Sequence, residues 1–284
     1  MPVNIFAEQK HNLLLQKNGY AIVPFLHADE IASLTRFFYD NHPSLPDGMY
    51  ASSHAPDFSL RKKMNDEIQY VCSRAMKTTF QNVTPLGATF MVKSKGENGS
   101  LHPHQDWNIV DEEHFHSYNI WLPLVDVEEY NGTLLILPDS HTLMQNIRGL
   151  HIPSSFAAVQ DELWSSLIPI RMKAGEALIY DHRLLHASGI NHSQQPRLVI
   201  VYGLIPAEAE MRFYLGKENT IEEYACSPDF YFEANILNGP DNLPLLRSFV
   251  NNNPAFTLEL LRAHYPKQQS VWQKLKSLWP FGKA

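Results

Sequence analysis

Hydrophobic positions in the first part of the chain recur mostly at helical spacing. Leu60, Met64 and Ile68 begin the longest such series, which continues to Ala75. Spacings of three and four residues place these side chains on one face of a helix, which we expect to pack on a sheet. The elements that this part of the pattern predicts are helices ending at Gly19, around residues 31–38 and over 60–75, and a short strand over 20–25.

From about residue 84 the hydrophobic positions alternate with polar ones. The segments that this alternation predicts to be strands are 88–94, 116–127, 132–137, 168–172, 177–180 and 198–203. Beyond Pro206 the pattern is weaker, and it predicts helices near 243–250 and 256–264. Many short strands after a helical start, without regular alternation of strand and helix, favour an antiparallel jelly roll over a parallel sheet.

We therefore expect a mainly β fold with flanking helices. The predicted organisation is a single domain over residues 1–284, with a helix-rich part (1–83), a jelly-roll core (about 84–206) and a C-terminal extension (207–284).

Composition narrows the class of protein. Of the 284 residues, 44% are hydrophobic and 19% are charged, which is an ordinary globular balance. The formal net charge of −7 provides no general basic surface, so nucleic acid is not an expected partner. Two cysteines are too few for a disulfide framework, and no segment approaches the ~20 apolar residues that span a bilayer. We expect a cytoplasmic protein whose partner is a small-molecule substrate.

The last segment, 271–284, carries Trp272 and Trp279 among several lysines. An interfacial amphipathic helix has this composition. A terminal helix that docks on the domain is the favoured interpretation, because the segment is short and weakly basic.

Candidate chemistry lies in the strand-rich half. In His104-Gln105-Asp106 a histidine and a carboxylate two residues apart would point to the same face of a strand and could bind one metal ion. His186 supplies a second histidine, and two histidines with one carboxylate leave open positions that are typical of non-haem Fe(II) sites. Since His102 and His104 also share a face, a zinc site that includes His182 or His186 is an alternative.

An arginine follows this set. Arg197 lies eleven residues after His186 and begins a strand with Val199 and Val201. The planar guanidinium suits bidentate capture of a carboxylate, and an arginine that enters a buried strand needs an anion. We expect Arg197 on a strand adjacent to that of His186, reaching into the same cavity. Pairing with a core Asp or Glu is the structural alternative.

These residues belong to an ordered series of motifs. The series comprises HQDW (104–107), NIWLPL (119–124), NGTL (131–134), PDSH (138–141) and HASG (186–189), followed by Arg197. It resembles the phytanoyl-CoA dioxygenase-like family of Fe(II)/2-oxoglutarate oxygenases, and the resemblance covers residues 88–203.

The resemblance implies a fold and a site. The fold would be a double-stranded β-helix, also called a jelly roll or cupin-like barrel. The positions that match the family's site are His104, Asp106 and His186 as Fe(II) ligands, Arg197 and Ser188 as contacts of the 2-oxoglutarate carboxylate, and Asn119 and Trp121 as lining of the co-substrate pocket. Val199 stands where some of these enzymes carry a serine. For Trp107 and His141, core packing is at least as good an account as a pocket role.

The resemblance also implies a reaction. Fe(II), 2-oxoglutarate and O₂ would together hydroxylate an unactivated C–H bond of a small molecule, with release of succinate and CO₂. Related halogenases replace the metal-binding carboxylate with a small residue, so Asp106 favours hydroxylation. A cupin-type metalloenzyme that does not use 2-oxoglutarate and a non-catalytic jelly-roll binding module are the alternatives. Segments 43–58 and 147–164 are candidate lids.

Overall fold

The computed structural model describes residues 4–45, 47–96, 99–228, 230 and 236–265. The C-terminal segment 271–284, for which two kinds of helix were considered, lies outside these residues. No helix in the described ranges is long and apolar enough to cross a membrane.

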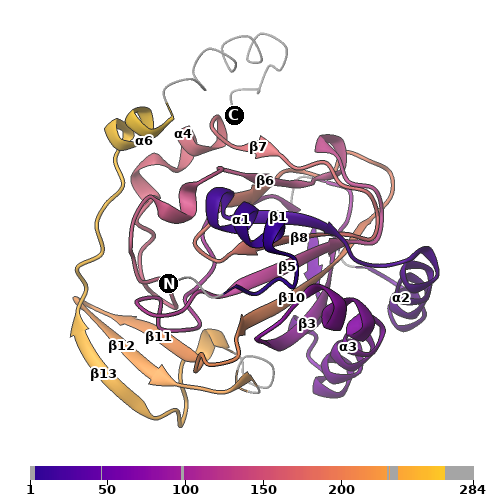
Figure 1. The fold of residues 1–284 in the computed structure, drawn as a ribbon, viewed down its shortest axis with the longest axis horizontal. Helices are drawn as coiled ribbons and strands as arrows, with labels where there is room; N and C mark the ends of the chain where they lie inside the picture. The colour runs from indigo at the N-terminus through magenta and orange to yellow at the C-terminus, as the bar shows by residue number, and fades with distance from the viewer. Residues whose placement is uncertain (1–3, 46, 97–98, 229, 231–235, 266–284) are drawn as a thin grey trace.

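The core is a double-stranded β-helix built from two antiparallel sheets (Figure 1). The larger sheet has the order β1 (Tyr20–Pro24), β8 (Glu176–Asp181), β5 (Tyr118–Pro123), β10 (Arg197–Pro206), β3 (Val83–Lys93) and β2 (Met49–Ala51). The smaller sheet has the order β4 (Leu101–His104), β9 (His186–Ser188), β6 (Leu134–Ile136) and β7 (Ile168–Pro169). The predicted strands are therefore confirmed, with ends that shift by a few residues.

Side chains from both sheets meet in one apolar cluster. Ile136 of the smaller sheet packs in it with Leu178 and Val199 of the larger sheet, and all three are fully buried. Because successive side chains of a strand point to opposite faces, this cluster uses only every second residue of each strand. The remaining residues of the larger sheet face outward and need a second cover.

Three N-terminal helices form that cover. They are α1 (Gln9–Asn18), α2 (Ala28–Asn41) and α3 (Phe58–Thr79). The helical series of α3 buries Met64 and Ile68 in the same cluster as Phe90 of β3 and Ile200 of β10. Gly19 ends α1 as predicted, with a φ of 81° and its N–H bonded to the Leu15 carbonyl at 2.9 Å.

The outer face of the smaller sheet is covered by residues from later in the chain. Ala187 of β9 packs with Leu163 of α4 (Gln160–Trp164) and Leu261 of α6 (Leu258–His264). Helix α6 confirms the helix predicted near 256–264. The short 3-10 helices are η1 (Ser52–His54), η3 (Glu129–Asn131), η4 (Ser140–Thr142), η5 (Ala157–Val159) and η6 (Ile236–Asn238).

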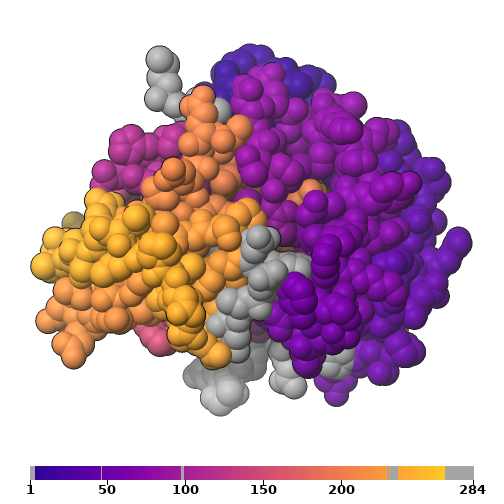
Figure 2. Space-filling view, turned by 90° about the horizontal axis from the view of Figure 1, so that it is seen from below, coloured from indigo at the N-terminus to yellow at the C-terminus, as the bar shows by residue number. Residues whose placement is uncertain are grey.

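The helix predicted near 243–250 is wrong. This segment forms β13 (Leu245–Val250), which completes a third sheet with β11 (Arg212–Lys217) and β12 (Thr220–Ala225). Arg247 pairs in register with Glu223, and their side chains form an ion pair. The free edge of β12 thus supplies hydrogen bonds that outweigh the weak helical pattern. Figure 2 shows this sheet, in orange to yellow, opposite the indigo to purple N-terminal part.

Candidate active site

The two candidate histidines lie side by side on adjacent strands of the smaller sheet. His104 ends β4 and is the register partner of His186, which begins β9, and the centroids of their rings lie 4.3 Å apart. The spacing of His104 and Asp106 suggested that both lie on one face of a strand. In the structure Asp106 lies beyond the end of β4, so the two residues do not share a strand face. The N–H of Asp106 donates to the His182 carbonyl oxygen at 2.9 Å, which holds the chain next to the segment leading into β9.

Asp106 nevertheless completes the group. Its Oδ1 lies 3.9 Å from Nε2 of His104 and 3.8 Å from Nε2 of His186. The three residues offer ligand atoms that all lie within 4.8 Å of one another. Imidazole and carboxylate are the donors of a two-His-one-carboxylate iron site, so this donor set fits a divalent iron ion.

Hydrogen bonds orient both imidazoles. Nδ1 of His104 lies 2.7 Å from the His102 carbonyl oxygen, and Nδ1 of His186 lies 2.9 Å from that of Leu184. A carbonyl oxygen only accepts, so each Nδ1 carries a proton, and the neutral imidazole then presents the lone pair of Nε2 toward Asp106. Burial, together with the neighbouring His104, lowers the pKa of His186 to about 4, which keeps its imidazole neutral near pH 7.

Two donors hold the other carboxylate oxygen of Asp106. Oδ2 accepts from Nδ2 of Asn119 at 2.9 Å and from the hydroxyl of Tyr180 at 3.0 Å. Burial by itself raises the pKa of Asp106. The facing histidines, with His186 strongest, and the Tyr180 hydrogen bond outweigh burial and hold it below its usual range. The carboxylate is therefore ionised, with Oδ1 left to face the histidines.

Asn119 and Tyr180 lie next to each other on adjacent strands. They are register partners on β5 and β8. Asn119 was expected to line the co-substrate pocket, and in the structure its amide contacts Asp106. Tyr180 was not singled out in the sequence, because a tyrosine in a buried strand is ordinary core composition.

The zinc alternative finds no support in the described residues. His102 is exposed, and its ring lies edge-on to Trp164 at 6.1 Å. Nδ1 of His182 contacts the Ser117 hydroxyl at 3.0 Å and the Trp107 carbonyl oxygen at 3.1 Å. Neither histidine belongs to the group of His104, Asp106 and His186.

Trp107 makes a packing contact and His141 makes a structural hydrogen bond. The ring of Trp107 lies edge-on to Phe213 at 6.3 Å, and Nε2 of His141 lies 3.1 Å from the Gln16 carbonyl oxygen. The further group of metal-ligating types that the described residues contain is Asp111, Glu113 and His114, which lies largely at the surface.

Arg197 lies deep in the barrel. It begins β10, whose neighbours are β3 and β5, so the expected adjacency to the strand of His186 is wrong, since β9 belongs to the other sheet. The guanidinium donates to the Gly132 carbonyl oxygen, and its Cζ lies 5.3 Å from the centre of the Trp121 ring. The side chain is buried, its Nε has no partner in the described part of the chain, and burial lowers its pKa to about 10.

A lysine that the sequence reasoning missed lies beside it. Lys93 of β3 is the register partner of Arg197 and is 0% exposed. Its Nζ donates to the Gly189 carbonyl oxygen at 2.5 Å and to both the hydroxyl and the carbonyl oxygen of Ser188. Burial, and then the charge of Arg197, lowers the pKa of Lys93 to about 6. A lysine in an alternating apolar strand was the signal that could have found it.

Lys93 and Arg197 together mark an anion site. Among the described residues, no carboxylate forms an ion pair with Lys93 or Arg197, so the alternative of a core acidic partner for Arg197 finds no support. A buried charge without a counter-ion is costly, and an anionic ligand would relieve that cost for Arg197 and favour the charged form of Lys93. Ser188 contacts Lys93 and lies two residues after His186, so the same face of β9 borders both the metal-ligand group and the anion site.

Comparisons with known proteins point to one family. The family model for phytanoyl-CoA dioxygenase matches residues 15–199. A relative from Danio rerio, phytanoyl-CoA dioxygenase domain-containing protein 1, is 23% identical over 150 residues, which is 50% of each chain. The match therefore spans about half the length of that relative.

Two solved structures share the fold. The epimerase SnoN in complex with Fe3+, alpha ketoglutarate and nogalamycin RO aligns with a TM-score of 0.53 and 18% identity, over 84% of this chain and 98% of that chain. The carbocyclase SnoK from nogalamycin biosynthesis aligns with a TM-score of 0.50 and 17% identity, over 72% of this chain and 86% of that chain. With the family model covering well over half of its residues, this chain belongs to the phytanoyl-CoA dioxygenase family.

Proposed function

We propose that this protein is an Fe(II)- and 2-oxoglutarate-dependent dioxygenase that hydroxylates an unactivated C–H bond of a small molecule. The observation that carries the proposal is that the metal-ligand group and the buried anion site lie next to each other. His186 of the two-His-one-carboxylate group and Ser188, which contacts Lys93 of the buried anion site, lie on the same face of β9, so the two sites border each other. A metal-chelating dianion such as 2-oxoglutarate needs both sites at once.

Each residue has a role that follows from its contacts. Nε2 of His104, Oδ1 of Asp106 and Nε2 of His186 would hold Fe(II). Arg197 and Lys93 would hold the far carboxylate of the co-substrate, with the Ser188 hydroxyl between Lys93 and β9. Trp121, whose ring lies against the Arg197 guanidinium, would close one side of this pocket and exclude water from it.

The bound group supplies the oxidation. Held by His104, Asp106 and His186, an iron ion would, with 2-oxoglutarate and O₂, supply the oxidation that adds a hydroxyl to the substrate and converts the co-substrate to succinate and CO₂. The epimerase and the carbocyclase show that this fold hosts other outcomes, so the fold does not select the reaction. The carboxylate of Asp106, in a position where halogenases carry a small residue, supports hydroxylation over halogenation.

The test begins with anaerobic protein, Fe(II) and 2-oxoglutarate. We expect the weak visible charge-transfer band of the chelate, which Asp106→Ala should abolish by loss of the metal. Arg197→Ala should keep metal binding and raise the 2-oxoglutarate concentration needed for the band. Arg171→Ala, at the surface, is the matched control. Folded, metal-loaded protein without the band would overturn the proposal.

The band alone leaves the substrate open. A panel of small molecules scored by succinate release would then identify the substrate class, and the hydroxylated product would be expected by mass. Turnover of a substrate without succinate would instead indicate a metalloenzyme that does not use 2-oxoglutarate.

A further inference from the structure

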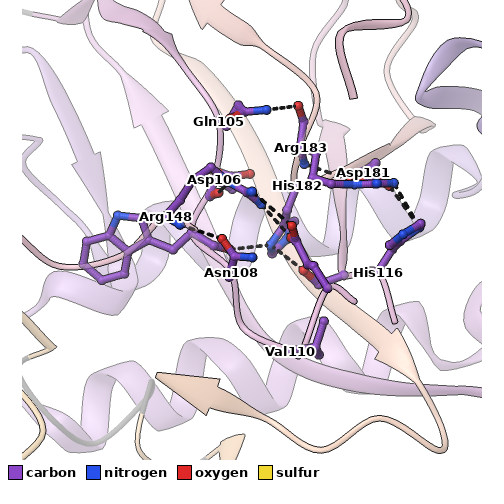
Figure 3. Close-up of polar contacts among 12 residues, drawn as sticks. Gln105, Asp106, Asn108, Val110, His116, Arg148, Asp181, His182 and Arg183 are labelled. Atoms are coloured by element: carbon purple, nitrogen blue, oxygen red, sulfur yellow. Dashed lines mark hydrogen bonds and ion pairs between the residues drawn. The ribbon is translucent and has the colours of Figure 1, made fainter. Parts of the chain in front are cut away.

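A buried arginine, Arg148, hydrogen-bonds to the backbone of the loop that carries Asp106 (Figure 3). Nε of Arg148 donates to the main-chain carbonyl oxygen of Asp106 at 2.7 Å. The same guanidinium makes two bonds to the Glu112 carboxylate, of 3.0 and 2.6 Å, and a third to the Asn146 carbonyl oxygen at 2.9 Å. Arg148 thus joins the backbone of a candidate metal ligand to a carboxylate further along the same loop.

The backbone from which Arg148 projects is itself fixed. Its N–H donates to Oδ1 of Asn108 at 2.7 Å, and the Asn108 N–H donates to the Arg148 carbonyl oxygen at 3.1 Å. One residue earlier, the side chain of Asn253 bonds to both the N–H and the carbonyl oxygen of Ile147, at 2.8 and 2.7 Å. The guanidinium therefore starts from an anchored point, and its position constrains Asp106 directly.

Burial makes this arrangement stiff. The side chains of Arg148 and Glu112 are 8% and 12% exposed, so water screens their charges little. A charge-assisted bidentate pair has one preferred geometry, because both the guanidinium and the carboxylate are planar. Arg171 and Glu129 form a pair of the same bidentate kind, with bonds of 3.0 and 2.7 Å, but at the surface. That pair provides a matched comparison.

We propose that Arg148 is a positioning residue for the metal centre and that Glu112 sets the orientation of its guanidinium. Asn119 and Tyr180 hold the carboxylate of Asp106 at one end, and Arg148 holds its backbone at the other. A ligand that is placed before the metal arrives loses less conformational freedom on binding. The inference rests on the proposed function, since it concerns the same metal site.

The experiment uses the full chain with Arg148→Lys, Glu112→Gln and the surface control Arg171→Lys. Three quantities are measured: the Co(II) affinity and its visible spectrum, the Fe(II)–2-oxoglutarate charge-transfer band, and the urea midpoint of the metal-free protein. We expect Arg148→Lys to weaken Co(II) binding about 10–100-fold, as loss of an outer partner of a metal ligand typically does, and to change the Co(II) spectrum. Glu112→Gln should act in the same direction with a smaller effect, and Arg171→Lys should match the wild type.

Each outcome decides something. If Arg148→Lys and Glu112→Gln lower only the urea midpoint and keep wild-type Co(II) affinity and spectrum, Arg148 is merely structural and the inference is overturned. If Arg148→Lys does not fold, Glu112→Gln carries the test alone. Wild-type protein that binds Co(II) but forms no band with 2-oxoglutarate would remove the proposed function, while the Co(II) measurements would still decide the role of Arg148.

Discussion

Replacement of Lys93 by methionine tests whether the anion site holds a neutral lysine when it is empty. The pKa of Lys93 is lowered from 10.5 to about 6 by burial and by Arg197. Between about pH 6 and pH 10.5 the unfolded chain carries a proton on Lys93 that the folded protein lacks. The free energy of unfolding of the wild type therefore gains a contribution that increases as pH rises from about 6 toward 10.5.

The magnitude follows from the size of the window. Between the folded and the unfolded pKa of Lys93, each pH unit changes the free energy of unfolding by about 1.4 kcal/mol. A change from about pH 7 to about pH 8.5 therefore adds roughly 2 kcal/mol to the free energy of unfolding of the wild type. Lys93→Met removes this contribution at both pH values. The variant also leaves the carbonyl oxygens of Ser188 and Gly189 without the amine donor of Lys93, but that loss does not vary with pH in this range and cancels in the comparison.

The assay is urea unfolding of metal-free protein at the two pH values, without 2-oxoglutarate. We expect the stability difference, wild type minus Lys93→Met, to increase by about 2 kcal/mol at the higher pH. Lys95→Met is the control, because Lys95 lies at the surface, where its Nζ contacts Gln194 at 2.9 Å. Equal pH dependence of wild type and Lys93→Met would refute the reasoning, since it would mean that burial does not displace the proton.

Three further predictions concern the same part of the molecule and its support. Binding of 2-oxoglutarate near pH 8 should take up a proton, because the bound anion favours charged Lys93; calorimetry in two buffers of different ionisation enthalpy measures this, and equal heats would contradict it. Tyr180→Phe should weaken Co(II) binding about 10-fold, because one of the two donors to Oδ2 of Asp106 is lost; an unchanged titration would show that Asn119 suffices. Gly19→Ala should lower the free energy of unfolding by about 1–3 kcal/mol, since its φ is 81° and a Cβ would lie 2.6 Å from Nδ1 of His141. Gly239→Ala, with a φ of 100° but open space, should cost less, and equal losses would show that the contact with His141 is unimportant.

Much of the fold could be predicted because most elements carry their own period. The series from Leu60 to Ala75 forms α3, and the alternating segments form β3, β5, β8 and β10. The segment 243–250 could not be assigned in this way. Its apolar residues fit either period, and the pairing of Arg247 with Glu223 decides between them through a strand that the sequence reasoning had not recognised.

The sequence by itself determined the order of the motifs, and with it the family and the candidate ligands His104, Asp106 and His186. The tertiary structure decided which other residues surround them. Lys93 lies opposite Arg197, Tyr180 lies beside Asn119, and Arg148 reaches the backbone of Asp106. A local sequence pattern records the spacing of side chains along one element, whereas these partners come from strands and loops that meet only when the two sheets close.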